Sequence, residues 1–243
     1  LAAFTREGLL RGNIPAGRCT PVPEGNAPTM AVCTPLLSIS IRGVRGGRVA
    51  LGSRVAVFGQ GVIGAFATHL AKLAGGCPVI AVDPVAARRD VAGQLGADAV
   101  IDPLNEDVPA RIAELTDSEG VHAAIEATAT PKVVASLPPL TARQGRIVIL
   151  GGVHGPVQMD LYTHVQKSDQ EIVGCGKPHW EDHPFSTDES NTEAIFRMMR
   201  GGMIRTEPLI THRVSFQEGP AVYQMLMNEK DKAIGVQFDW SEA

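Results

Sequence analysis

The sequence predicts an α/β protein built on a doubly wound parallel sheet, and three observations lead to this fold class. Short apolar runs that suit buried strands alternate with longer segments whose apolar residues recur at helical spacing. Strands that are separated by helices of this length form parallel sheets with right-handed crossovers. A glycine-rich turn, Gly59 to Gly64, joins the first of these strands to the helix that follows it. We therefore expect one such sheet, accompanied by a partial second domain that is formed by the chain ends.

Length and composition restrict the class of protein. A chain of 243 residues with a formal net charge of −4 can bury a substantial core and has no basic stretch suited to nucleic acid. No apolar run has the length of a membrane-spanning helix. Cys19, Cys33, Cys77 and Cys175 are far apart in the sequence, so we expect reduced and mostly buried thiols. These features favour a cytoplasmic protein without nucleic-acid or membrane partners.

The segment before the sheet is expected to contain one kinked helix. Residues 1–25 are rich in glycine and proline and show little periodicity. Asn26 is a suitable helix cap, and Pro28 fits the first turn. Pro35 should kink this helix, because proline removes an internal hydrogen bond. Gly47, the last of three closely spaced glycines, should end it.

The remaining elements alternate along the chain. The first strand runs from Val55 to the glycine turn, and the later sheet strands are expected at 79–83, 99–101, 121–126, 146–150 and 171–174. Helices are expected between them at 62–74, 86–95, 108–116 and 132–137. Beyond the sheet, the pattern predicts helices at 192–200 and 218–228 and a closing strand at 233–238.

Gly59, Gly61 and Gly64 have the Gly-x-Gly-x-x-Gly spacing between a strand and a helix. In that context Gly59 allows a tight turn, Gly61 lets the backbone approach a pyrophosphate, and Gly64 lets helix and strand pack closely. The following helix, which begins at Val62 and Ile63, presents free N–H groups and a partial positive charge to the phosphates. The motif predicts a dinucleotide site of the Rossmann type, and the alternative is a plain βαβ unit with a glycine turn.

An acidic residue at the end of the second strand indicates which dinucleotide is bound. Asp83 lies 22 residues after Gly61. A carboxylate at this position can accept hydrogen bonds from both ribose hydroxyls and would repel a 2′-phosphate, which favours NAD over NADP. Arg88 and Arg89 weaken this preference, because a guanidinium group can hold a phosphate bidentately.

Residues after two later strands are further candidates for the site. Thr128 follows the strand at 121–126, and Gly151, Gly152 and Val153 follow the strand at 146–150. Ligands of doubly wound sheets bind at the carboxyl ends of the strands. We therefore expect these residues beside the cofactor, although each is also compatible with an ordinary loop.

Several other stretches match a known family. They are PVPEG at 21–25, SRVAVFGQGVIG at 53–64, LGAD at 95–98, GRIVILGG at 145–152, PLITHR at 208–213 and IGVQF at 234–238. Through these stretches the chain resembles the medium-chain dehydrogenase/reductase family, particularly its zinc-type alcohol, polyol and threonine dehydrogenases. The resemblance implies that 1–25 is the remnant of a catalytic domain and a linker, 26–175 an NAD-binding Rossmann domain, and 176–243 a segment that returns to the catalytic domain.

The resemblance also implies an activity and an assembly. We expect an NAD-dependent oxidoreductase that transfers hydride between nicotinamide and a secondary alcohol, polyol or amino alcohol, so that its substrate is a small alcohol or ketone. A homodimer or homotetramer is expected, with two sheets joined edge to edge around 171–174. Because Leu1 is not methionine, we interpret the chain as either a processed product or a part of a longer protein.

The zinc site expected for this family lacks its ligands in this sequence. The Gly-His-Glu motif and the zinc-binding cysteine are absent, and Thr34 stands where some polyol dehydrogenases have a glutamate. His179 and His183 have a spacing that can hold a metal on a helix, but prolines bracket them and no third ligand is evident. Tyr162 and Lys167 are five apart rather than the four of the short-chain Tyr-x-x-x-Lys pair. We therefore assign no metal ligand and no catalytic residue.

Two functions of other classes remain open at this point. A noncatalytic NAD-binding module, or a subunit that relies on a partner for chemistry, is favoured by the missing ligands. A methyltransferase also uses a glycine turn and an acid after the second strand, but it fits the third glycine and the carboxy-terminal stretches poorly.

Overall fold

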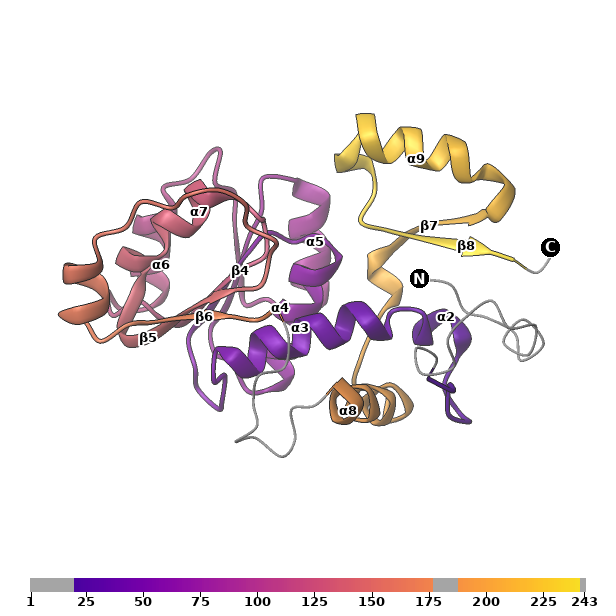
Figure 1. Cartoon of the computed structure of the whole chain (residues 1–243), viewed down its shortest axis with the longest axis horizontal. Coiled ribbons are helices and arrows are strands. Elements are labelled where there is room, and N and C mark those ends of the chain that lie inside the picture. The colour runs from indigo at the N-terminus through magenta and orange to yellow at the C-terminus, as the bar shows by residue number, and fades with distance from the viewer. Residues whose placement is uncertain (1–19, 177–187, 241–243) are drawn as a thin grey trace.

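The computed structural model of this chain describes residues 20–176 and 188–240. Its core is a six-stranded parallel sheet (Figure 1). The strand order in this sheet is β3-β2-β1-β4-β5-β6. The strands are β1 Val55–Phe58, β2 Val79–Val82, β3 Ala99–Ile101, β4 Val121–Glu126, β5 Thr141–Ile149 and β6 Glu171–Gly174. This order, with β1 and β4 at the centre, is the doubly wound α/β arrangement that the sequence predicts.

Helices cover both faces of the sheet. Along β1, Val55 and Val57 point into one apolar core, and Ala56 and Phe58 point into the other. The first core also contains side chains of α3 (Thr34–Gly46), α4 (Val62–Leu73), α5 (Ala86–Gln94) and α8 (Asp188–Arg200). The second core contains side chains of α6 (Val108–Leu115) and α7 (Pro131–Ser136). Because both faces are covered, β1 and β2 read as continuous apolar runs.

The single kinked helix expected from Asn26 is wrong. The structure has a short α2 (Pro28–Ala31), after which α3 begins as a separate helix. Pro35 lies in the first turn of α3, where a missing backbone N–H costs nothing, so it starts a helix instead of bending one. Asn26 does not cap α2, because its side-chain amide donates to the carbonyl of Pro23 at 3.1 Å.

The first residues of one strand, β5, and one helix, α8, also differ from the predictions. Strand β5 begins at Thr141, five residues before the predicted start. The sequence pattern does not show this start, because the pairing of β5 with β4 is irregular there. The register passes from Val121 opposite Thr141 to Ala123 opposite Arg146, so the extra residues form a bulge that interrupts the strand pattern. Helix α8 begins at 188 rather than 192.

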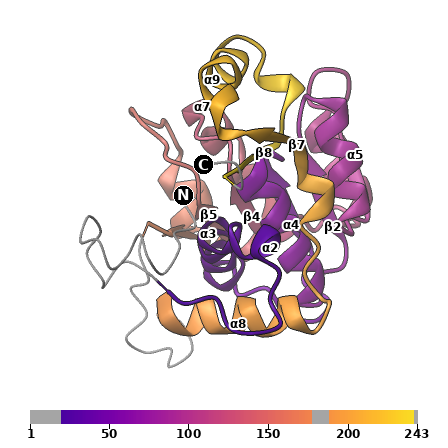
Figure 2. The ribbon, with the colours of Figure 1, turned by 90° about the vertical axis from the view of Figure 1, so that its right-hand side faces the viewer.

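The carboxy-terminal part of the described chain forms a second, smaller sheet. Strand β7 (Ile210–Ser215) pairs in parallel with β8 (Gly235–Asp239), and α9 (Gly219–Asn228) connects them (Figure 2). The side-chain amide of Gln237 donates to the carbonyl of Thr29 at 2.6 Å. The two ends of the described chain therefore meet, in agreement with the predicted partial second domain.

The thiols follow the prediction in part. Cys33 and Cys175 are buried and free, whereas Cys77 is exposed, and Cys19 lies outside the described residues. Burial raises the pKa of the Cys33 thiol to about 11, so this group is an apolar packing residue at neutral pH. Within the described ranges, no helix has the length and apolar character needed to cross a membrane.

Candidate functional site

A cavity of about 570 Å³ lies at the carboxyl ends of β1, β2, β3 and β4. Five of the predicted site residues line it: Gly59, Gly61, Asp83, Arg88 and Thr128. Because these residues follow three neighbouring strands of a parallel sheet, the fold brings them to one edge. This is the edge at which ligands bind in doubly wound sheets.

The structure shows a different effect of an added side chain at each of the three glycines of the turn. Gly59 has a φ of +89°, and a Cβ there would stand 2.9 Å from the methyl group of Thr128. A Cβ on Gly64 would stand 1.8 Å from the carbonyl oxygen of Gly59, so helix and turn are in direct contact. A Cβ on Gly61 would meet no atom of the protein within 4 Å. Gly61 is therefore the one of the three whose open side faces space rather than protein.

The first turn of α4 accepts a hydrogen bond from a neighbouring helix but has no side-chain cap among the described residues. Gly61 occupies the N-cap position, and no side chain in the described part of the chain caps it. The wholly buried hydroxyl of Ser40, on α3, donates to the carbonyl of Ile63 at 2.8 Å. The first-turn N–H groups, which belong to residues such as Val62 and Ile63, carry the positive end of the helix dipole.

Asp83 is fixed against the glycine turn. Its side chain is 3% exposed, and its Oδ2 accepts the backbone N–H of Gln60 at 2.6 Å. Its Oδ1 accepts the backbone N–H of Val85 at 2.8 Å. The Nη1 of Arg88 lies 3.9 Å from Oδ2. The acid, the turn and one guanidinium group therefore form a connected unit at the cavity wall.

Arg89 is turned away from the cavity. Its Nη1 donates to the carbonyl of Asp83 at 2.7 Å, and its Nη2 lies 2.9 Å from Oδ2 of Asp102. The backbone N–H of Leu104 and the side chain of Asn105 lower the pKa of Asp102, and Arg89 adds to this effect. Asp102 therefore stays ionised, and Arg89 is engaged within the fold.

A buried acid that the sequence reasoning missed lies beneath the loops after β4 and β5. Oε1 of Glu126 accepts the backbone N–H of Thr128 at 2.6 Å and also its hydroxyl. The backbone N–H of Gly151 donates to the backbone carbonyl of Glu126 at 2.8 Å. A Cβ on Gly151 would stand 2.7 Å from Oε2 of Glu126, which has no hydrogen-bond partner among the described residues. Its position as the last residue of a predicted strand was the available signal.

The other predicted residues are not among those that line the cavity. Val62, Ile63 and Gly64 form the first turn of α4, and Gly151, Gly152 and Val153 follow β5 at the same edge of the sheet. The rest of the wall was not predicted, and its chief members are Pro103, Leu104, Val108, Pro109, Thr130, Val133, Ser136 and Leu140. Pro103 and Leu104 follow the strand at 99–101, so the tendency of ligands to bind at the carboxyl ends of strands predicts their position. The residues of α6 and α7 depend on tertiary packing and had no local signal.

The described residues do not fit a zinc ion. Within 20–176 and 188–240, no group of three or more histidine, cysteine or acidic side chains lies close enough together to hold a metal. His179 and His183 lie outside these ranges. No step of a reaction can therefore be assigned to a metal on the residues that the structure describes.

Comparison with known proteins gives consistent matches. The family described as zinc-binding dehydrogenase matches residues 62–184. D-guloside 3-dehydrogenase of Escherichia coli K12 is 30% identical over 224 residues, which cover 89% of this chain and 64% of the relative. L-threonine 3-dehydrogenase of Pyrococcus furiosus is 28% identical over 201 residues, which cover 82% and 55%. The chain therefore spans less than two thirds of the length of these relatives.

A solved structure agrees with this result. A putative zinc-binding dehydrogenase of Sinorhizobium meliloti, bound to NADP, superimposes with a TM-score of 0.75 at 26% identity. The match covers 86% of this chain and 59% of that one.

Proposed function

The chain belongs to the zinc-binding dehydrogenase family, and from this premise we propose that it binds NAD and serves an oxidoreductase of the medium-chain alcohol dehydrogenase type. The reaction proposed is hydride transfer between nicotinamide and a secondary alcohol, polyol or amino alcohol. The observation that carries the proposal is the meeting, in one cavity, of the open side of Gly61, the uncapped start of α4 and the fixed carboxylate of Asp83.

Each part of the dinucleotide has a proposed position. The pyrophosphate would lie against Gly61 and the N–H groups of Val62 and Ile63, where a helix start favours anions. The adenosine ribose would bind Asp83, and the adenine would occupy the mainly apolar space beside Leu104. The nicotinamide half would lie near Thr128 and the segment 151–153. The bound cofactor supplies the hydride chemistry, and these residues bind and orient it.

NAD is favoured over NADP by the charges at the ribose position. The buried carboxylate of Asp83 opposes a 2′-phosphate, and Arg89 is already engaged by the Asp83 carbonyl and by Asp102. Among the described residues, Arg88 is the arginine that lines this cavity, and its Nη1 lies 3.9 Å from Oδ2 of the same carboxylate. The structure from Sinorhizobium meliloti is bound to NADP, and titrations of this chain with NADH and NADPH test its preference.

The substrate, the assembly and the domain division are proposals for the whole protein. The relatives named above are dehydrogenases of small molecules, which supports a small alcohol or ketone substrate. We assign residues 26–175 to the cofactor domain and 176–243 to a segment that returns to a catalytic domain. Pairing of two copies along β6 would produce a homodimer, or a homotetramer by further association, and would cover a strand whose outer edge is exposed.

A noncatalytic NAD-binding subunit is the second candidate, because the described residues contain no metal cluster. The two functions differ in turnover. The protein purified from its own cells, assayed with NAD and a panel of secondary alcohols, should reduce NAD if it is the dehydrogenase. Tight NADH binding without turnover in that preparation would instead favour the noncatalytic subunit.

The binding proposal is tested by Gly61→Ala. Gly61 has a φ of −66°, which any residue adopts, and its added methyl group would meet no protein atom, so the fold should keep its stability. The methyl group would occupy the space that the pyrophosphate needs, and we expect NADH binding, measured by fluorescence titration, to weaken by about tenfold or more. Gly93→Ala, the same chemical change on an open face of α5, is the matched control. Equal NADH affinity in both variants would refute the proposed site.

A further inference from the structure

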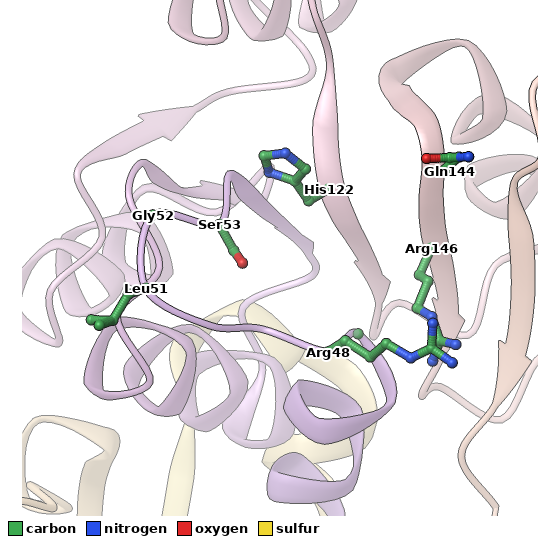
Figure 3. A pocket seen from close by; sticks show the side chains of 8 residues that line it. Arg48, Leu51, Gly52, Ser53, His122, Gln144 and Arg146 are labelled. Atoms are coloured by element: carbon green, nitrogen blue, oxygen red, sulfur yellow. The ribbon is translucent and has the colours of Figure 1, made fainter.

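A second cavity lies at the opposite end of the sheet. It has a volume of about 380 Å³ and is bounded by the connection from 47 to 53, by His122 on β4, and by Gln144 and Arg146 on β5 (Figure 3). The connection 47–53 precedes β1, His122 is the second residue of β4, and Arg146 pairs with Glu171 at the start of β6, whereas the glycine turn follows β1. This cavity is therefore separate from the proposed cofactor site.

Two side chains that line this cavity, His122 and Ser53, accept backbone hydrogen bonds and each retain a hydrogen that can be donated. His122 accepts the backbone N–H of Arg54 on its Nδ1 at 2.9 Å, so the ring hydrogen of the neutral form lies on Nε2. Burial lowers the pKa of His122, and the charge of Arg54 lowers it further. Oγ of Ser53 accepts the N–H of Ala50 at 3.0 Å, which leaves the hydroxyl hydrogen to be donated elsewhere.

Two guanidinium groups form another part of the wall. Figure 3 shows the side chains of Arg48 and Arg146 next to each other. Arg146 is 4% exposed, and its Nη1 donates to the carbonyl of Gly46 at 2.8 Å. Its Nη2 lies 2.5 Å from Oε2 of Glu171, and Nη1 of Arg48 lies 3.2 Å from Oε1 of the same carboxylate. Two positive groups share one negative group, so this wall keeps an excess of positive charge.

The lining contains arginine, histidine, serine and glutamine side chains and no carboxylate. Glu171 pairs with the arginines but does not line the cavity. The lining therefore combines positive charge with hydrogen-bond donor groups, and this combination suits an anion.

The backbone at this cavity is also unusual. Arg48 has a φ of 50° and Gln144 a φ of 58°, in the left-handed region that residues other than glycine rarely adopt. Each such residue costs on the order of 1 kcal/mol, and strain of this kind clusters at ligand-binding positions. Arg48 and Gln144, two of the six non-glycine residues with positive φ in the described chain, line the cavity.

We propose that this cavity binds a small oxyanion, a phosphate or carboxylate group. Arg48 and Arg146 supply the charge, and the Nε2–H of His122 and the hydroxyl of Ser53 donate hydrogen bonds from the other wall. Because the site uses none of the residues assigned to NAD, it stands whether or not NAD binds.

Arg48→Gln tests this site. The Arg48 side chain is 69% exposed, so the variant should keep its fold. Inorganic phosphate is titrated calorimetrically at constant ionic strength into protein with and without NADH, because the start of α4 also suits phosphate. We expect the wild type to bind phosphate in the presence of NADH and Arg48→Gln to bind it about tenfold more weakly. Parallel titrations with acetate and citrate distinguish a phosphate site from a carboxylate site.

Arg143→Gln is the matched control for charge. Arg143 is 71% exposed, pairs with Asp169, and does not line the cavity. Its phosphate affinity should equal that of the wild type. Two outcomes would overturn the proposal: equal loss of binding in both variants, which indicates a diffuse charge effect, or no saturable oxyanion binding by the wild type. If NADH does not bind, the difference between the two variants in its absence still decides the question.

Discussion

The contact between the glycine turn and α4 gives a sharp prediction for Gly64→Ala. The added Cβ would stand 1.8 Å from the carbonyl oxygen of Gly59, 2.9 Å from its carbonyl carbon and 3.3 Å from the Cβ of Ala127. The nearest atom belongs to the backbone, so no side-chain rotation can relieve the overlap. Helix α4 must instead move away from β1 and the turn.

The size of the effect follows from two opposing contributions. Overpacking of a well-packed region costs about 1–3 kcal/mol, and contact with rigid backbone places this case at or above the upper end of that range. Alanine in place of glycine in a helix returns at most about 1 kcal/mol. We therefore expect a net loss of about 2 kcal/mol in the free energy of unfolding, which lowers the Tm by about 4–8 °C for a chain of this size.

Thermal and urea unfolding of Gly64→Ala and Gly93→Ala measure this loss. Gly93 is also in a helix, but a Cβ there meets no atom within 4 Å, so the control should gain about 0.5–1 kcal/mol. NADH affinity should fall in Gly64→Ala and stay unchanged in the control. A Gly64→Ala protein as stable as the control would show that the turn and helix are not in the contact described.

Two further predictions concern buried titratable groups. Burial lowers the pKa of His69 from 6.5, and its Nε2 accepts the N–H of Arg205 at 3.2 Å, so the neutral form stabilises the fold. The contribution of His69 to the free energy of unfolding should be fully present above pH 6.5 and should decrease as the pH falls from there toward the folded-state pKa. Urea unfolding between about pH 5 and 8 should show that the free energy of unfolding depends less on pH in His69→Gln than in the wild type. Asp83→Asn would place an amide N–H against the N–H of Gln60 or Val85, which should lower the unfolding free energy by about 1–3 kcal/mol. It should also weaken NADH binding more than NADPH binding, and titrations that show a greater loss for NADPH would contradict the proposed role.

Elements whose signal is local were predictable from the sequence. The strands β1 and β2 are buried on both faces, so their apolar runs are unbroken, and the three glycines have the spacing that their contacts require. The acid at 83 also follows from position alone, since it ends a strand beside the turn. These residues place the candidate site without any knowledge of packing.

Elements that depend on their partners were missed. The sequence pattern does not indicate where β5 starts, because the extra residues of the bulge between β4 and β5 interrupt the alternation of apolar and polar residues that is typical of a strand. Strand β7 is half exposed and carries Thr211, His212 and Arg213, so its pattern resembles a loop until β8 pairs with it. Ser40 and Glu126 are buried polar residues whose acceptors and donors come from other elements. Their roles cannot be read from neighbouring residues.

The hydrogen bond from Gln237 to Thr29 joins residues that are 208 positions apart. During synthesis on the ribosome, this contact cannot form until β8 has been synthesised, whereas the six strands of the main sheet are synthesised before β8. The entropy of closing so long a loop grows only slowly with length, so the delay concerns timing more than stability. A nascent chain stalled before β8 would already contain the glycine turn and Asp83. It would, however, present β7 as an unpaired strand, open to pairing with another chain.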